Sequence, residues 1–179
     1  MKKAVFLDRD GTINIDKNYV YRVEDFKFLP GAIDGLKRFK KAGYLLIVIT
    51  NQSGIARGYY TEEDYNILEK WMLDQLRIAG ADIDAVYHCP HLPDAQVEEF
   101  RLDCECRKPK IGMFKTAIER FDIDVEKSIV IGDKMRDLTI CKNGKTKGFL
   151  VYSDKEKKES NIQYITEGIS KVADYMKIW

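Results

Sequence analysis

Acidic and hydroxyl side chains come directly after three short apolar runs of the sequence, where buried strands would end. Asp8 and Asp10 follow the run 4–7, Thr50 follows 45–49, and Asp133 follows 128–131. Residues two apart on an extended segment point the same way, so Asp8 and Asp10 are expected to bring their carboxylates together. Such a pair repels unless a cation lies between the two groups. Asp133 would add a third oxygen ligand, and this set suits Mg²⁺.

A lysine completes this group of reactive side chains. Lys108 precedes a predicted helix that leads into the run 128–131. Its ammonium group and the Thr50 hydroxyl are expected to bind phosphoryl oxygens beside the acids. A carboxylate can accept a phosphoryl group when a metal and a lysine neutralise the charge. The residue types therefore predict phosphoryl-transfer chemistry at the strand ends.

Short apolar runs alternate with helical patterns along the chain. The runs predict buried parallel strands at 4–7, 45–49, 85–87, 128–131 and 149–152. Helices are expected around 33–39, 61–76 and 114–121, with Thr61 and Asp64 as a capping box, and the tail 162–179 is expected to hold an edge strand and a last helix. This alternation predicts a three-layer, Rossmann-like α/β fold with a central parallel sheet. Ligands bind such sheets at the carboxyl ends of the strands, where the reactive residues fall.

Three of the four cysteines cluster with a histidine in a CxH…CxC pattern. The pattern comprises Cys89, His91, Cys104 and Cys106. Thiolates and imidazole suit Zn²⁺, and four protein ligands indicate a closed, structural site. Such a site would tie down the loop 89–106 and place Arg107 and Lys108 directly after a fixed ligand. His88 is expected to point away from this site, and Cys141 to be a small buried side chain.

Length, charge and the N-terminus restrict the class of protein. The 179 residues fit one compact domain, 1–179, and the net charge of +1 offers no broad basic surface for nucleic acid or a membrane. The run 4–7 is too short for a signal peptide, and no stretch is long enough to span a bilayer. We therefore expect a cytoplasmic protein, a monomer by default, with a small-molecule partner.

The reactive residues resemble a known family. Asp8-Arg9-Asp10-Gly11-Thr12, Thr50, Lys108 and Gly132-Asp133 are similar to the four motifs of haloacid dehalogenase superfamily phosphatases, in the same order. The resemblance implies that Asp8 is the nucleophile that forms an aspartyl phosphate and that Asp10 is the general acid and base. It implies Mg²⁺ bound by the Asp8 side chain, the Asp10 backbone carbonyl and Asp133, and it supports the same four zinc ligands. The short spacing between the motifs predicts no large cap domain.

Longer runs resemble one branch of that superfamily. Residues 50–58, 97–101 and 106–109 are similar to phosphatases that remove the 7-phosphate from heptose 1,7-bisphosphate, in nucleotide-activated heptose and lipopolysaccharide biosynthesis. The resemblance covers roughly residues 4 to 137. It implies a set of substrate contacts: Asp16, Lys17, Asn18, Tyr19, Thr50, Asn51, Gln52, Ser53, Arg107, Lys108 and Lys134.

Several alternatives stay open from the sequence. A histidinol-phosphate phosphatase shares the nucleophile motif and the zinc loop, a phosphatase of nucleic-acid ends lacks support from the charge, and a zinc-stabilised binding module would not need the intact acids. Arg57 either contacts substrate or caps a surface loop. Asp137 either orients Lys108 or a metal-bound water, or is an ordinary early-helix acid. The loops 13–29, 53–60 and 89–106 are expected to select an extended, doubly charged substrate, with Arg107 near its sugar or second phosphate. The stretch 154–160 is expected to be a solvated loop.

Overall fold

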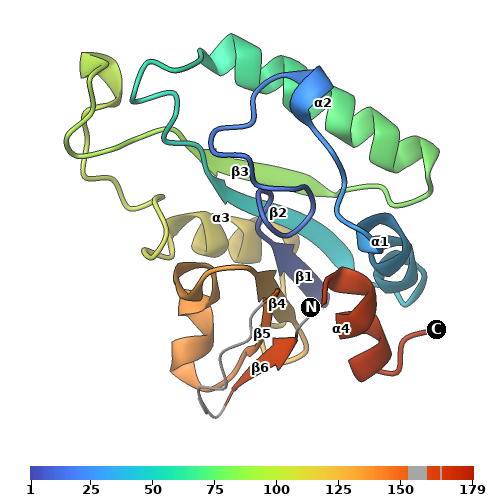
Figure 1. The fold of residues 1–179 in the computed structure, drawn as a ribbon. Coiled ribbons are helices and arrows are strands. Elements are labelled where there is room, and N and C mark those ends of the chain that lie inside the picture. The colour runs from blue at the N-terminus through green and yellow to red at the C-terminus, as the bar shows by residue number, and fades with distance from the viewer. Residues whose placement is uncertain (153–160, 166) are drawn as a thin grey trace.

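A six-stranded parallel sheet forms the centre of the protein, as the apolar runs predicted (Figure 1). The computed structural model describes residues 1–152, 161–165 and 167–179. The strands are β1 Ala4–Leu7, β2 Leu45–Asn51, β3 Ala85–Cys89, β4 Ile129–Gly132, β5 Lys147–Val151 and β6 Ile162–Ile165. Strands β2 and β3 extend two residues beyond the prediction, and β4 and β5 are displaced by one or two residues. The predicted loop 154–160 lies outside the described residues.

Helices cover both faces of the sheet. Helices α1 Ala32–Lys41, α2 Glu62–Ile78 and α4 Ile169–Tyr175 contribute to one apolar cluster, whereas α3 Gly112–Phe121 and the 3₁₀ segment η3 Met135–Asn143 contribute to the other. Alternate residues of β1 divide between the clusters, with Val5 and Leu7 in the first and Ala4 and Phe6 in the second. This period of two confirms the three-layer α/β fold.

The start of α2 is the predicted capping box. The Asp64 backbone N–H donates to Thr61 Oγ1 at 3.1 Å, and the Thr61 N–H donates to Asp64 Oδ2 at 2.8 Å. These bonds satisfy two backbone donors that a helix start leaves free. They also define where the loop that follows β2 ends.

The strand order β3-β2-β1-β4-β5-β6 creates a switch point beside β1. The chain builds outward from β1 through β2 to β3, and then crosses to the other side of β1 to form β4. In parallel sheets this reversal opens a crevice at the carboxyl ends of the strands. Asp8, Thr50 and Asp133 lie at the ends of β1, β2 and β4, so the topology brings them to one edge.

Two long connections at this edge contain only single 3₁₀ turns as regular structure. Residues 8–31 join β1 to α1 and contain one 3₁₀ turn, η1 Val23–Asp25, and the loop after β3 contains another, η2 Glu98–Phe100. Within residues 1–152 no separate cap domain is present, which agrees with the prediction. No helix of the described ranges is long and apolar enough to cross a membrane.

Candidate active site and cysteine–histidine cluster

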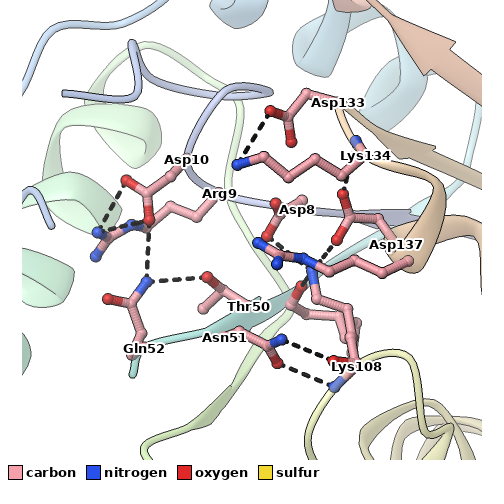
Figure 2. A network of polar contacts seen from close by, with 12 residues as sticks. Asp8, Arg9, Asp10, Thr50, Asn51, Gln52, Lys108, Asp133, Lys134 and Asp137 are labelled. Carbon is pink, nitrogen blue, oxygen red and sulfur yellow. Dashed lines mark hydrogen bonds and ion pairs between the residues drawn. The ribbon is translucent and has the colours of Figure 1, made fainter. Parts of the chain in front are cut away.

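Three carboxylates and one lysine meet beyond the ends of β1 and β4 (Figure 2). Oxygen atoms of Asp8, Asp133 and Asp137, here called the acid cluster, all lie within 4.8 Å of one another. Lys108 Nζ lies 2.8 Å from Asp8 Oδ1 and 2.8 Å from Asp137 Oδ1, and it donates to the Ile49 carbonyl at 2.6 Å. Asp137 thus contacts Lys108, and its Oδ2 also accepts from the Lys134 N–H at 3.0 Å at the start of the 3₁₀ segment, so it fills both kinds of role that the sequence left open for it.

Burial changes the acidity of this cluster. Asp8 is 7% exposed and Lys108 is 2% exposed. Burial raises the pKa of Asp8 to about 7, Lys108 opposes that rise, and the charges of Asp137 and Asp10 add to it. Burial also raises the pKa of Asp133, with Lys134 opposing it. Although burial opposes it, the charges of Asp8 and Asp137 raise the pKa of Lys108, so the lysine stays protonated.

The acid cluster fits a divalent cation. Two lysines cannot balance three carboxylates: Lys108 pairs with Asp8 and Asp137, and Lys134 Nζ lies 3.5 Å from Asp133 Oδ2. Asp133 Oδ1 is also buried without a hydrogen-bond partner among the described residues. Hard carboxylate oxygens at this spacing are ligands that Mg²⁺ accepts. Gly11 lets the turn after β1 approach, since its φ is +83° and a Cβ there would lie 2.4 Å from Asp133 Oδ2. The cluster is therefore closed on one side by backbone.

Asp10 does not share the acid cluster, so the expectation that its side chain follows that of Asp8 is wrong. Its carboxylate accepts hydrogen bonds from Arg9 Nε and Nη2 at 3.0 Å each, from Asn14 Nδ2 at 2.9 Å and from Gln52 Nε2 at 3.1 Å. Figure 2 shows it turned towards Arg9 and Gln52, apart from Asp133. The reason is that β1 ends at Leu7, and the turn through Gly11 redirects the chain. The metal contact expected through the Asp10 carbonyl stays a prediction.

Arg9 is a residue of the site that sequence reasoning missed. Its side chain is 1% exposed, forks onto both Asp10 oxygens, and donates from Nη2 to the Val20 carbonyl at 2.7 Å. The guanidinium also lies 5.6 Å from the Tyr65 ring centroid. An arginine after a strand is ordinarily exposed, and the only signal was its place between two acids. Arg9 joins Asp10 to the end of the segment 16–19.

The backbone of Lys108 is held by a reciprocal amide pair. Asn51 Nδ2 donates to the Lys108 carbonyl at 3.0 Å, and the Lys108 N–H donates to Asn51 Oδ1 at 3.0 Å. Gln52 is fixed in a similar way, because Tyr60 donates its hydroxyl to Oε1 at 2.6 Å while Nε2 donates to Thr50 Oγ1 at 2.9 Å. Both amides, predicted to contact substrate, thus also position catalytic candidates.

A cleft of about 250 Å³ opens at this edge. It is lined by Asp8, Asp10, Asp16, Asn18, Tyr19, Thr50, Asn51, Gln52, Ser53, Arg57, Tyr60, Arg107, Lys108, Lys134 and Arg136. The predicted contact Lys17 is exposed and outside this lining, and Asp133 lies in the acid cluster instead. Tyr60 and Arg136 line the cleft without having been singled out. The loop 89–106 supplies no lining residue, so it touches the cleft only through the residues that follow it.

The four residues of the CxH…CxC pattern converge as predicted. Sγ atoms of Cys89, Cys104 and Cys106 lie 3.0 to 3.4 Å apart, and His91 Nδ1 is 3.7 Å from Cys89 Sγ and 3.4 Å from Cys106 Sγ. These sulfur separations exceed a disulfide bond of about 2.05 Å, and the cysteines are free. Three sulfurs and one nitrogen are a donor set that suits Zn²⁺. We call them the cysteine–histidine cluster.

Neighbours of that cluster behave as the sequence indicated. His88 points away, with its ring 4.3 Å from Tyr65 and Nε2 3.3 Å from Glu62. Cys141 is buried in the apolar layer on the α3 side. Arg107 donates from Nη1 to the His91 carbonyl at 3.2 Å, which ties the first cleft residue after the loop to a cluster member.

Known proteins are similar to this chain in sequence. Residues 3–168 match the family model described as Polynucleotide kinase 3 phosphatase. The chain is 42% identical over 183 residues to D-glycero-beta-D-manno-heptose-1,7-bisphosphate 7-phosphatase of Pasteurella multocida, covering 99% of this chain and 98% of that protein. It is 48% identical to the protein of that name from Escherichia coli K12, over 75% of this chain and 71% of the relative.

Solved structures extend the likeness to the fold. D,D-heptose 1,7-bisphosphate phosphatase from B. bronchiseptica, complexed with magnesium and phosphate, superposes with a TM-score of 0.85 at 29% identity, covering 98% of each chain. A had-like phosphatase from Mesorhizobium loti gives a TM-score of 0.88 at 30% identity, covering 99% of this chain and 85% of that one. This protein therefore belongs to the haloacid dehalogenase superfamily of phosphatases, in the family of the heptose-bisphosphate phosphatases, and is a phosphomonoester hydrolase.

Proposed function

We propose that this enzyme hydrolyses the 7-phosphate of D-glycero-D-manno-heptose 1,7-bisphosphate through an aspartyl phosphate on Asp8. The observation that carries the proposal is the Asp8 carboxylate, which is buried, 2.8 Å from Lys108 Nζ, and part of the acid cluster that borders the cleft. The relatives reported above supply the substrate, since they carry the heptose bisphosphate name. Phosphoryl transfer needs charge neutralisation and positioning, and this edge of the sheet offers both.

The first half of the reaction transfers the phosphoryl group. An Asp8 oxygen attacks phosphorus, the bond from phosphorus to the C7 oxygen breaks, and Asp10 gives its proton to that oxygen. The products are the aspartyl phosphate and heptose 1-phosphate. In the second half Asp10 accepts a proton from water as the water attacks phosphorus, and the bond to Asp8 breaks to release inorganic phosphate.

The residues around Asp8 and Asp10 position the phosphoryl group and the two carboxylates for these steps. Lys108 and the Thr50 hydroxyl bind the phosphoryl oxygens, and Asn51 holds the lysine backbone in place. Mg²⁺, bound by Asp8, Asp133 and the Asp10 carbonyl, would offset the repulsion between the carboxylates and the phosphate oxygens. Arg9 keeps the Asp10 carboxylate aimed away from Asp8, so the two acids stay available for different steps.

The cysteine–histidine cluster has a supporting role in this proposal. Zn²⁺ bound by Cys89, His91, Cys104 and Cys106 would fix the loop 89–106 and, through Cys106, the position of Arg107 and Lys108. We further propose that residues 1–179 act as one phosphatase domain, monomeric and cytoplasmic, within nucleotide-activated heptose and lipopolysaccharide biosynthesis. These last assignments rest on the sequence.

Steady-state assays with competing substrates test the proposal. We expect heptose 1,7-bisphosphate to be hydrolysed with a kcat/KM at least roughly 100-fold above that of histidinol phosphate or of a 3′-phosphorylated oligonucleotide, because neither competitor offers the heptose hydroxyls and the second phosphate monoester for hydrogen bonding. Equal or reversed preference would sink the heptose assignment. Acid-quenched reactions with ³²P-labelled substrate should place the label on Asp8, and the Asp82→Asn variant, altered at an exposed surface acid, is the matched control for Asp8→Asn.

A further inference from the structure

Three arginines face the cleft without a carboxylate partner. Arg57, Arg107 and Arg136 line it, and none of them forms an ion pair among the described residues. The acids of the lining are already engaged: Asp8 with Lys108 at 2.8 Å, Asp10 with Arg9 at 2.9 Å, and Asp16 with Lys134 at 3.2 Å. Arg107 donates from Nη1 to the His91 carbonyl, so the three guanidinium groups have hydrogen-bonding capacity to spare but no anionic partner among the described residues.

One phosphate does not account for these three groups. The reacting phosphate is served by Lys108, Thr50 and the cation that the acid cluster fits. Guanidinium groups gathered in a cleft repel one another unless anionic oxygens lie between them, and their forked donors match a phosphate group. The arrangement therefore indicates that the ligand carries a second anionic group.

Arg57 is the member of this set with the strongest need for a ligand. Its side chain is half-buried, and Nε is buried with no hydrogen-bond partner among the residues described. A buried donor left unpaired loses its bond to water without replacement, so such groups ordinarily have a partner. The Arg57 side chain caps no backbone carbonyl of its loop, so the loop-cap alternative raised from the sequence finds no support.

The backbone around Arg57 is held independently of its side chain. The Arg57 N–H donates to the Ser53 carbonyl at 3.0 Å, and the Ala56 carbonyl accepts from the Gln96 and Val97 N–H groups at 3.0 Å each. Ala56 is fully buried against Leu92 and Ala95 in the loop 89–106. The guanidinium is thus presented from a fixed position, which favours a binding role.

We propose that Arg57 binds the second phosphate of the substrate, the one that is not hydrolysed, and thereby sets the preference for a bisphosphate. Arg107, expected from the sequence near the sugar or the second phosphate, lies on the same side of β1, because Arg57 follows β2 and Arg107 follows the loop after β3. Arg136 is exposed and comes from η3 beyond β4, on the other side of β1. The inference rests on the proposed function, in which the second phosphate is that on C1.

A substrate-by-variant comparison tests this role. The ratio of kcat/KM for heptose 1,7-bisphosphate to that for heptose 7-phosphate measures what the second phosphate contributes. We expect Arg57→Ala to lower the ratio roughly 10- to 100-fold, the range for lost hydrogen bonds to a charged group, and Arg57→Lys to lower it less because the charge remains. The control Arg120→Ala, at an exposed position of α3, should leave the ratio as it is. A ratio in Arg57→Ala equal to that of Arg120→Ala overturns the proposal.

Binding to an inactive variant separates this inference from the proposed reaction. In an Asp8→Asn background, calorimetry with heptose 1,7-bisphosphate should show a dissociation constant raised roughly 10-fold or more by Arg57→Ala. If the parent enzyme hydrolyses neither sugar phosphate, the proposed reaction fails, yet Arg57-dependent binding still supports the inference and Arg57-independent binding overturns it. Thermal unfolding checks that each variant is folded, and Arg57→Gln replaces Arg57→Ala if the latter is not.

Discussion

Two groups of ligand-type side chains lie near one edge of the sheet, and they are assembled in different ways. The acid cluster takes Asp8 from the end of β1 and Asp133 and Asp137 from beyond β4, more than a hundred residues along the chain, whereas the cysteine–histidine cluster lies wholly within residues 89–106. Oxygen donors favour Mg²⁺, and sulfur and nitrogen donors favour Zn²⁺. The acid cluster borders the cleft, but no member of the other cluster lines it. The difference suggests a division between chemistry and support.

The largest expected effect is on the acid cluster. Asp8→Asn should lower kcat roughly 10⁴-fold or more, the size found when a nucleophile is removed. Thermal stability of the metal-free protein should not fall, because burial and neighbouring charge already disfavour the ionised Asp8 carboxylate. Phosphate release and a melting curve measure the two effects.

Chelation provides the companion experiment for Asp8→Asn. Removing the divalent cation with EDTA should abolish phosphate release, and added Mg²⁺ should restore it. Full turnover in the presence of the chelator would show that the reaction needs no divalent cation at the acid cluster. The proposed division between chemistry at the acid cluster and support from the cysteine–histidine cluster would then be wrong. Asp82→Asn should behave as the parent enzyme in both assays.

A change in the cysteine–histidine cluster should instead act first on stability. Cys104→Ala removes one of four ligands, so bound zinc should fall from about one per chain towards none. Loss of a structural metal should cost about 3 kcal/mol or more, and each kcal/mol corresponds to roughly 2–4 °C in melting temperature for a chain of this size. Atomic emission and melting curves measure both.

Cys141→Ala is the control for that variant. Cys141 is buried in the same apolar layer but lies outside the cluster, so zinc content should stay at the parent value. If Cys104→Ala kept both zinc and melting temperature, the cluster would have no supporting role. Turnover of the Cys104→Ala variant is expected to fall as well, because Arg107 and Lys108 directly follow Cys106, another member of the cluster.

The same contrast explains what the sequence could predict. The four members of the cysteine–histidine cluster lie within eighteen residues, so local spacing identifies them, and the apolar runs and the Thr61–Asp64 box identify strands and a helix start. The acid cluster depends on strand order and on the direction of side chains after a turn, which local patterns do not encode. For that reason the sequence pattern predicts the Asp10 carboxylate beside that of Asp8 and does not indicate its partner in the structure, Arg9. Tyr60 and Arg136 line the cleft through tertiary packing that no motif marks.

A smaller effect on kcat is expected at Asn51, which holds the backbone of Lys108 between the loop 89–106 and the acid cluster. Asn51→Ala removes both hydrogen bonds to the Lys108 backbone, which are 3.0 Å long in the parent. Displacing a catalytic group by about 1 Å can cost roughly 100-fold in rate, so we expect kcat to fall roughly 10- to 100-fold with zinc content unchanged. Asn51→Asp keeps the acceptor for the Lys108 N–H and should fall less. Equal turnover in Asn51→Ala and the parent would show that the loop alone positions Lys108.

The smallest expected effect is the pH dependence of the acid cluster, and it has opposite signs for the metal-free and metal-bound protein. The pKa of Asp8 is about 7 in the folded protein and 3.8 without the fold, mainly because of burial. Between these values the folded state binds more protons, so the free energy of unfolding of metal-free protein should decrease as pH rises from about 4 to about 7. Mg²⁺ requires the ionised carboxylate, so its affinity should increase over the upper part of that range, by up to about tenfold per pH unit, and level off above pH 7. Calorimetric titration with Mg²⁺ at about pH 6 and about pH 8 measures the change, and Asp8→Asn should flatten it. An affinity independent of pH in the parent would mean that Asp8 is already ionised in the folded, metal-free state, so the acid cluster would carry its full negative charge before any cation binds.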